Sequence, residues 1–118
     1  MVIRLPISSD RLLGFKMTGK LHDEDYKRFV PFIEAAIRKN GKVRLLALFE
    51  EFEGWDAHAV WADTKFAVEH GRDVEKIALV GDREWEKWMA VVCKPFTLAK
   101  LEYFDARDID RAWKWLAK

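Results

Sequence analysis

The sequence predicts one α/β domain over residues 1–118, with a mixed five-stranded sheet and four main helices. Residues 2–18 have the pattern of a hairpin, which makes the first strand an antiparallel edge strand. From residue 23 onward, helical and strand-like apolar patterns alternate, and this alternation implies crossover connections between parallel strands. Residues 77–80 form a continuous apolar run, as expected of a strand covered on both faces.

The amino-terminal hairpin is predicted from alternation and from turn residues. Residues 2–7 alternate apolar and polar, and Pro6 indicates a sheet edge because proline lacks an amide donor. Residues 8–10 supply the turn. The second strand covers residues 11–18, and we expect Gly19 to end it. Its apolar side chains fall on one face: Leu13, Phe15 and Met17.

The clearest helical pattern covers residues 23–39. We expect His22 or Asp23 at the N-cap, and Asn40-Gly41 at the carboxyl end. Pro31 removes a backbone hydrogen bond and should bend the helix, but the apolar stripe continues across it. The stripe repeats at helical spacing: Tyr26, Phe29, Val30, Ile33 and Ile37.

The middle of the chain predicts a central strand followed by a helix. Residues 43–49 are apolar almost throughout. The acidic residues that follow are Glu50, Glu51 and Glu53, a cluster typical of a solvated loop at a strand end. A helix is then expected at about residues 57–70, ended by Gly71.

Residues 74–96 predict a strand, a sharp turn and a large amphipathic helix. Gly81 ends the apolar run, Asp82 can cap a helix over residues 83–94, and Pro95 stops that helix. One apolar stripe is expected on it: Trp85, Trp88, Met89 and Val92.

The last strand and helix close the domain. Residues 98–104 predict the strand, and Asp105 or Asp108 is expected to cap the helix. Its buried stripe is predicted to contain Ile109, Ala112, Trp113 and Leu116. Trp115 is expected to point elsewhere.

Composition excludes several classes of protein. Lys plus Arg is 21 and Asp plus Glu is 20, so the formal net charge of +1 gives no reason to expect nucleic acid as a partner. A single cysteine, Cys93, leaves no internal disulfide. Residues 1–10 lack the apolar stretch of a signal peptide, and no apolar run is long enough to span a membrane. We expect a cytoplasmic location, with peripheral membrane association as an extension.

Two stretches resemble the SpoIIAA-like family of small bacterial proteins. The first reads GKLHDEDYKRFVPFIEAAIRKNGKVRLLALFEEFEGW, with a glycine after the second strand, an acidic-Asp-Tyr helix start and a "GKVRLL" strand entry. The second is the ending FDARDIDRAWKWL. The resemblance implies a mixed sheet wound with helices, as in anti-sigma-factor antagonists, and kinship with the lipid-carrying CRAL-TRIO fold. Ligand binding and membrane association are proposed for members of the family.

One departure from the anti-sigma-factor antagonists concerns regulation. Those proteins carry a phosphorylatable serine in an Asp-Ser-Ser-Gly turn at the start of the second main helix. The corresponding region here reads EGWDAHAVWAD and contains no hydroxyl before Thr64. A phosphoserine switch needs that hydroxyl. We therefore expect no such switch.

The candidates for catalysis or metal binding have simpler explanations. The histidines His22, His58 and His70 lack metal-binding spacing, so we expect no metal and no cofactor. Cys93 is expected to be a buried, inert thiol. The segment Gly81-Asp82-Arg83 is a capped turn rather than a phosphate loop. The glutamates at 50–53 leave a hydrolase as the third hypothesis, which two facing carboxylates in a cleft would favour.

Aromatic residues near the predicted second and third helices carry the functional hypothesis. Tryptophan favours boundaries between apolar and polar surroundings, although large aromatic side chains more often belong to a core. In open α/β sheets, ligands bind at the carboxyl ends of the strands. These ends are expected at residues 19–22, 50–56, 81–85 and 105–108. The candidate ligand-binding residues are Trp55, Trp61, Phe66, Trp85, Trp88 and Met89.

The leading hypothesis is a non-enzymatic module that binds a small apolar or amphipathic ligand, with peripheral membrane contact as an extension. The second is a protein–protein interaction domain that uses the same apolar helix faces against a partner or a second copy, as a homodimer. A pocket enclosed within one chain would favour the first hypothesis. A flat apolar patch buried only in a dimer would favour the second.

Overall fold

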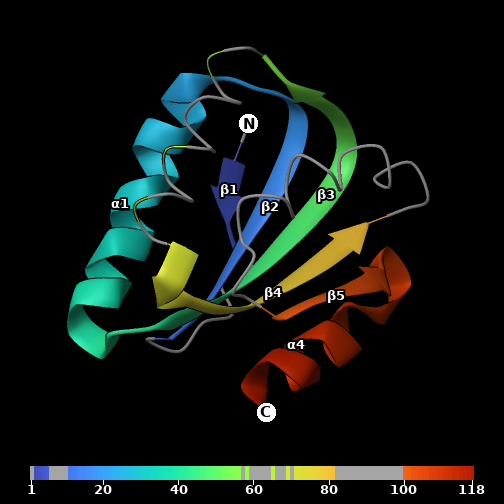
Figure 1. Cartoon of the computed structure of the whole chain (residues 1–118). Helices are drawn as coiled ribbons and strands as arrows, with labels where there is room; N and C mark the ends of the chain where they lie inside the picture. Colours follow the sequence, from blue (N-terminus) through green and yellow to red (C-terminus); the bar gives the residue numbers. More distant parts are fainter. Residues whose placement is uncertain are drawn as a thin grey trace.

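The computed structural model describes residues 2–5, 11–56, 58, 65, 69, 71–81 and 100–118. Five strands form one sheet in the order β1-β2-β3-β4-β5 (Figure 1). Their bounds are β1 Val2–Arg4, β2 Leu12–Leu21, β3 Val43–Trp55, β4 Val74–Gly81 and β5 Lys100–Asp105. Only β1 is antiparallel to its neighbour, and β2 to β5 pair in parallel. The predicted mixed sheet with an antiparallel first strand is confirmed.

Two strands run further than the sequence predicted. Gly19 does not end β2, and β3 continues past Phe49 through the acidic segment that was expected to be a loop. The two extensions pair with each other, Gly19 opposite Phe52 and Leu21 opposite Trp55, with register shifts on either side of Gly19. Gly19 has a φ of +63°, so it forms a bulge that bends the strand without ending it.

Helix α1, Asp23–Asn40, connects β2 to β3 and covers one face of the sheet (Figure 1). His22 is its N-cap residue, and the His22 amide donates to Asp25 Oδ2 at 2.9 Å. Gly41, at φ +84°, closes the helix by donating its amide to the Ile37 carbonyl at 2.7 Å. Pro31 lies inside α1 at an exposed position, and the helix continues across it as predicted.

The core between α1 and the sheet is aliphatic and aromatic. Phe29 of α1 packs against Phe15 of β2, with ring centroids 5.1 Å apart. Burying a side chain of this size stabilises the fold by about 1.5–3 kcal/mol. The strands contribute mainly the side chains that alternate on this face: Leu13, Phe15, Leu45, Ala47, Phe49, Ile77 and Leu79.

A second core lies on the opposite face, beneath helix α4, Ile109–Ala117, which follows the 3₁₀ turn η3, Ala106–Asp108 (Figure 1). Ala112 and Leu116 are fully buried there against Leu46, Ala78 and Val80. Both β3 and β4 therefore carry apolar side chains on both faces, as their continuous apolar runs predicted.

The two tryptophans of α4 are both half-buried. Trp113 lies so close to Gly14 that a Cβ built at Gly14 would be 2.7 Å from Trp113 Cη2. The helical stripe predicted that Trp115 points away from the sheet, but it does not. Its ring lies 6.0 Å from that of Phe104 and beneath the Lys76 ammonium. The short helix lies close enough to β4 and β5 for this flank to be covered as well.

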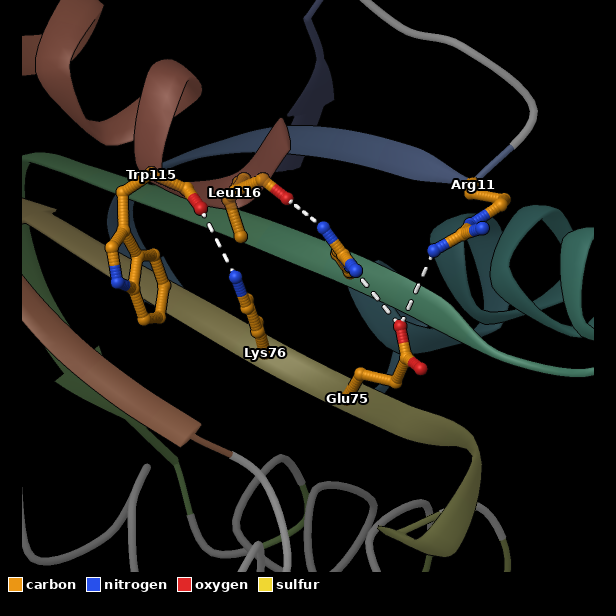
Figure 2. Close-up of polar contacts among 6 residues, drawn as sticks. Arg11, Glu75, Lys76, Trp115 and Leu116 are labelled. Carbon is orange, nitrogen blue, oxygen red and sulfur yellow. Dashed lines mark hydrogen bonds and ion pairs between the residues drawn. The ribbon is translucent and has the colours of Figure 1, made fainter. Parts of the chain in front are cut away.

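The carboxyl end of α4 is fastened to the sheet by two cations, as Figure 2 shows. Arg44 donates to the Leu116 carbonyl, and Lys76 donates to the Trp115 carbonyl at 3.2 Å. The last carbonyls of a helix lack intrahelical partners and carry partial negative charge, so cationic donors satisfy them well. Arg44 also donates to Glu75 at 3.0 Å.

The helices predicted at residues 57–70 and 83–94 lie outside the described residues, apart from three positions. His58, Lys65 and Glu69 are helical and exposed. The 3₁₀ turn η1, Gly71–Asp73, then leads into β4. Of the helices that the structure describes, none has the length and apolar character needed to cross a membrane.

Candidate functional site

The carboxyl ends of β2 and β3 lie side by side, where α1 begins. We call this end of the parallel strands the carboxyl edge of the sheet, and the end where the strands begin the amino edge. Leu21 pairs with Trp55, and the Asp56 amide donates to the Leu21 carbonyl at 3.0 Å. This edge is the one that the sequence predicted for a ligand, because carboxyl ends of parallel strands converge there.

The backbone at this edge bends sharply. Gly19 has φ +63° and Gly54 has φ +105°, conformations that glycine adopts without strain. Glu51 has φ +49°, and no other non-glycine residue in the described part of the chain has a positive φ. A side chain in this region costs about 1 kcal/mol or more, and such strain concentrates at functional sites.

A pocket of about 580 Å³ opens where the two strands bulge, lined by Thr18, Gly19, Glu51, Phe52 and Glu53. It is an open hollow at the surface and not an enclosed cavity. Phe52 also lines this pocket, and its ring stands edge-on to that of Phe49, with centroids 4.9 Å apart. The pocket can therefore accept a ligand with both an apolar part and a polar, preferably cationic, group.

His22 and Asp56 form a second polar feature at the same edge. His22 Nδ1 pairs with Asp56 Oδ2, and both side chains are partly exposed. The pair joins the start of α1 to the end of β3 and complements the predicted capping role of His22. Sequence reasoning missed it because the two residues are 34 positions apart. One feature of the sequence could have indicated the pair: His22 directly follows β2 and Asp56 directly follows β3, and these two strands are neighbours in the sheet.

The glutamates at 50–53 do not act as one group. Glu50 forms an ion pair with Lys16 at 3.3 Å, whereas Glu51 and Glu53 line the pocket. All three side chains are exposed. Within the described residues, His, Cys, Asp and Glu side chains do not gather in the groups of three that would hold a metal.

Only one of the predicted ligand-binding residues belongs to the described part of the chain. Trp55 is the last residue of β3 and follows the pocket segment directly. The others lie outside the described residues: Trp61, Phe66, Trp85, Trp88 and Met89. Their assignment to a ligand site stays a prediction.

Comparisons with known proteins identify relatives of this chain. The SpoIIAA-like family model matches residues 12–117. An uncharacterized protein of the DUF3478 family from Shewanella loihica, with a SpoIIAA-like fold, superposes with a TM-score of 0.79 at 30% identity. That match covers 98% of this chain and 93% of the other. A comparison with curated proteins gave no match.

Proposed function

The chain belongs to the SpoIIAA-like family, and from that premise we propose that it is a non-enzymatic module that binds a small amphipathic ligand. The binding region is the carboxyl edge of the sheet. A membrane surface is the proposed place where the module takes up or releases the ligand, through peripheral contact.

The observation that carries this proposal is the pocket of about 580 Å³ between the bulged ends of β2 and β3. Phe52 lines it beside Glu51 and Glu53, whose carboxylates bring negative charge. A cation over an aromatic ring and near carboxylates gains from both contacts. The polar group of the ligand is therefore proposed to be cationic, and its apolar part to extend along the carboxyl edge of the sheet.

Native mass spectrometry of the purified protein is the first experiment, because it reports bound ligand and subunit count together. Titration with dodecylamine and with dodecanoate then tests the polar group, using intrinsic tryptophan fluorescence. We expect a saturable blue shift with the amine at lower concentration than with the acid. No spectral change with either probe, in a folded protein, would contradict the proposal.

Two variants test whether the fluorescence response to dodecylamine comes from binding in the pocket. Glu53→Gln should weaken amine binding by about tenfold, since a charged hydrogen bond contributes about 1.5 kcal/mol or more. Glu50→Gln is the matched control, because Glu50 pairs with Lys16 and does not line the pocket. Equal weakening in both variants would mean that general surface charge, and not the pocket, attracts the amine.

A second candidate function, a homodimeric interaction domain, is favoured by an exposed aromatic side chain on α1. Phe32 is 49% exposed. The Arg4 guanidinium lies 5.1 Å from the centroid of the Phe32 ring, so β1 borders this surface. A dimer in the native mass spectrum that Phe32→Ser converts to monomer would select this candidate. Glu53→Gln should leave the subunit count unchanged.

A further inference from the structure

A second pocket lies at the amino edge of the sheet, around the amino ends of β3, β4 and β5. Its volume is about 420 Å³. Its lining includes five cationic side chains and one carboxylate: Lys42, Arg44, Arg72, Lys76, Lys100 and Glu75. Five positive charges against one negative charge leave a formal surplus of four.

Two of these cations are held rigidly by α4. The Arg44 side chain is only 15% exposed and is fixed between Glu75 and the Leu116 carbonyl. Lys76 donates to the Trp115 carbonyl and lies 5.0 Å above the Trp115 ring (Figure 2). Glu75 compensates the charge of Arg44, whereas the Trp115 carbonyl and ring orient Lys76 without a formal negative charge. Both cations are therefore preorganised.

The other three cations are available to a ligand. Lys42, Arg72 and Lys100 are exposed and come from three separate segments. Among the described residues, no carboxylate forms an ion pair with any of them. The pocket therefore combines two cations held by α4 with three exposed ones.

The charges in the pocket already affect one another. Desolvation lowers the pKa of Lys76, and the neighbouring Arg44 and Lys100 lower it further. The hydrogen bond from Arg44 holds the pKa of Glu75 below its ordinary value. Glu75 also accepts from Arg11 at 3.4 Å, so its single negative charge is shared between two guanidinium groups. Repulsion among the remaining cations would be relieved by a bound anion.

We propose that this pocket binds a multiply charged anion of the phosphate-ester class. Arginine forks and lysine ammonium groups are the usual ligands of phosphate oxygens, and Arg72, Lys42 and Lys100 can close around such a group. The pocket exceeds the size of inorganic phosphate and leaves room for a small organic moiety beside Val74. This site is independent of the proposed amphipathic-ligand pocket, because it lies at the other edge of the sheet.

The test is a titration of the whole protein with inorganic phosphate and with glycerol 3-phosphate at constant ionic strength, followed by ¹H–¹⁵N NMR. We expect saturable shifts of the backbone amides of residues 72–76 and 100. The double variant Arg72→Gln/Lys100→Gln should weaken binding by at least about tenfold, because two charged contacts to the anion are lost. The matched control is Lys20→Gln/Arg28→Gln, which removes two exposed cations elsewhere.

Vesicles separate the two sources of a phosphate group. Co-sedimentation with phosphatidylcholine vesicles, with and without phosphatidic acid, tests a lipid headgroup. Binding of free phosphate esters, or of phosphatidic acid vesicles alone, supports the anion pocket when the Arg72→Gln/Lys100→Gln variant abolishes it and the control retains it. No binding of any of these probes, or equal weakening in both variants, would overturn the proposal. Neither outcome bears on dodecylamine binding at the carboxyl edge.

Discussion

The two edges of the sheet are built differently, although the same parallel strands reach both. At the amino edge, α4 fixes Arg44 and Lys76 through its last carbonyls, and the pocket there is cationic. At the carboxyl edge, the backbone bends at Gly19, Glu51 and Gly54, and the pocket there is lined by carboxylates. One edge is fastened by side chains, and the other is shaped by the backbone.

The small net charge of this chain conceals a strong separation of charge between the two edges. The chain has a formal net charge of only +1, from 21 basic and 20 acidic residues. Yet parallel strands place residues that precede them at one edge and residues that follow them at the other. Basic residues near strand starts and acidic residues near strand ends therefore produce two pockets of opposite sign.

The largest expected effect comes from removing the anchor of α4. Trp113→Ala should lower the free energy of unfolding by about 3 kcal/mol, the lower end for a tryptophan because the side chain is half-buried. Trp115→Ala should lose about 1–2 kcal/mol, since it contacts Phe104 and Lys76 at the helix flank. Urea titrations of both variants measure this. Equal losses would show that Trp113 has no special role in holding α4 over Gly14.

A matched pair of substitutions compares the ion pairs of the two edges. Arg44→Met should destabilise the fold by about 2 kcal/mol, because Glu75 and a helix carbonyl lose their donor. Lys16→Met removes the partner of Glu50 at the carboxyl side and should change stability by less than about 1 kcal/mol, as an exposed pair does. A larger loss of stability in Lys16→Met than in Arg44→Met would contradict this, because the ion pair at the amino edge would then not be the more stabilising one.

Much of this fold could be predicted from sequence, because apolar periodicity and capping residues are local signals. The strand–helix alternation, the N-cap at His22 and the closing Gly41 belong to this class. The extension of β3 to Trp55 could not be predicted, because Glu50–Glu53 have the composition of a loop. Those residues are held in the strand by pairing with β2, which depends on tertiary structure.

The sites were predicted less completely than the fold. The carboxyl edge was predicted from topology, and Trp55 lies there, but the lining residues Thr18 and Phe52 carried no signal of their own. The cationic pocket was missed because its residues are scattered from Lys42 to Lys100. They meet only when three strands align, and spacing along the chain does not reveal that alignment.

A smaller expected effect is the loss of stability in acid that Glu75 causes at the amino edge. The pKa of Glu75 lies below its ordinary value of 4.5 because Arg44 donates a hydrogen bond to the carboxylate. Its contribution to stability is therefore present above pH 4.5 and is lost as the pH falls through the folded pKa. Glu75 is 33% exposed, so after solvent screening we expect at most about 1 kcal/mol.

The measurement compares the wild type with Glu75→Gln in urea at several pH values. The stability difference between them should be largest near neutral pH and should shrink in acid. Glu50→Gln serves as the control, because Glu50 belongs to an exposed pair at the other edge. A Glu75→Gln difference that is constant across the acid range would mean that charge is not what Glu75 contributes.

The smallest expected effect is a gain in stability at the carboxyl edge. Glu51 adopts φ +49°, which glycine tolerates better than any residue with a Cβ. Glu51→Gly should therefore stabilise the fold by about 0.5 kcal/mol, the relief of strain being partly offset by the greater freedom of glycine in the unfolded chain. Glu53→Gly, two residues away in the same strand and without a positive φ, should instead destabilise it by about 0.5–1 kcal/mol.

The same pair of variants separates strain kept for function from strain that is incidental. Both glutamates line the carboxyl-edge pocket, so both glycine variants remove one carboxylate from it. If Glu51→Gly is more stable than the wild type and binds dodecylamine less well, the strained conformation is retained because it places a carboxylate in the pocket. If Glu51→Gly is destabilised as much as Glu53→Gly, the backbone at residue 51 is not strained. The bend at this edge would then come from the pairing of β2 with β3 alone.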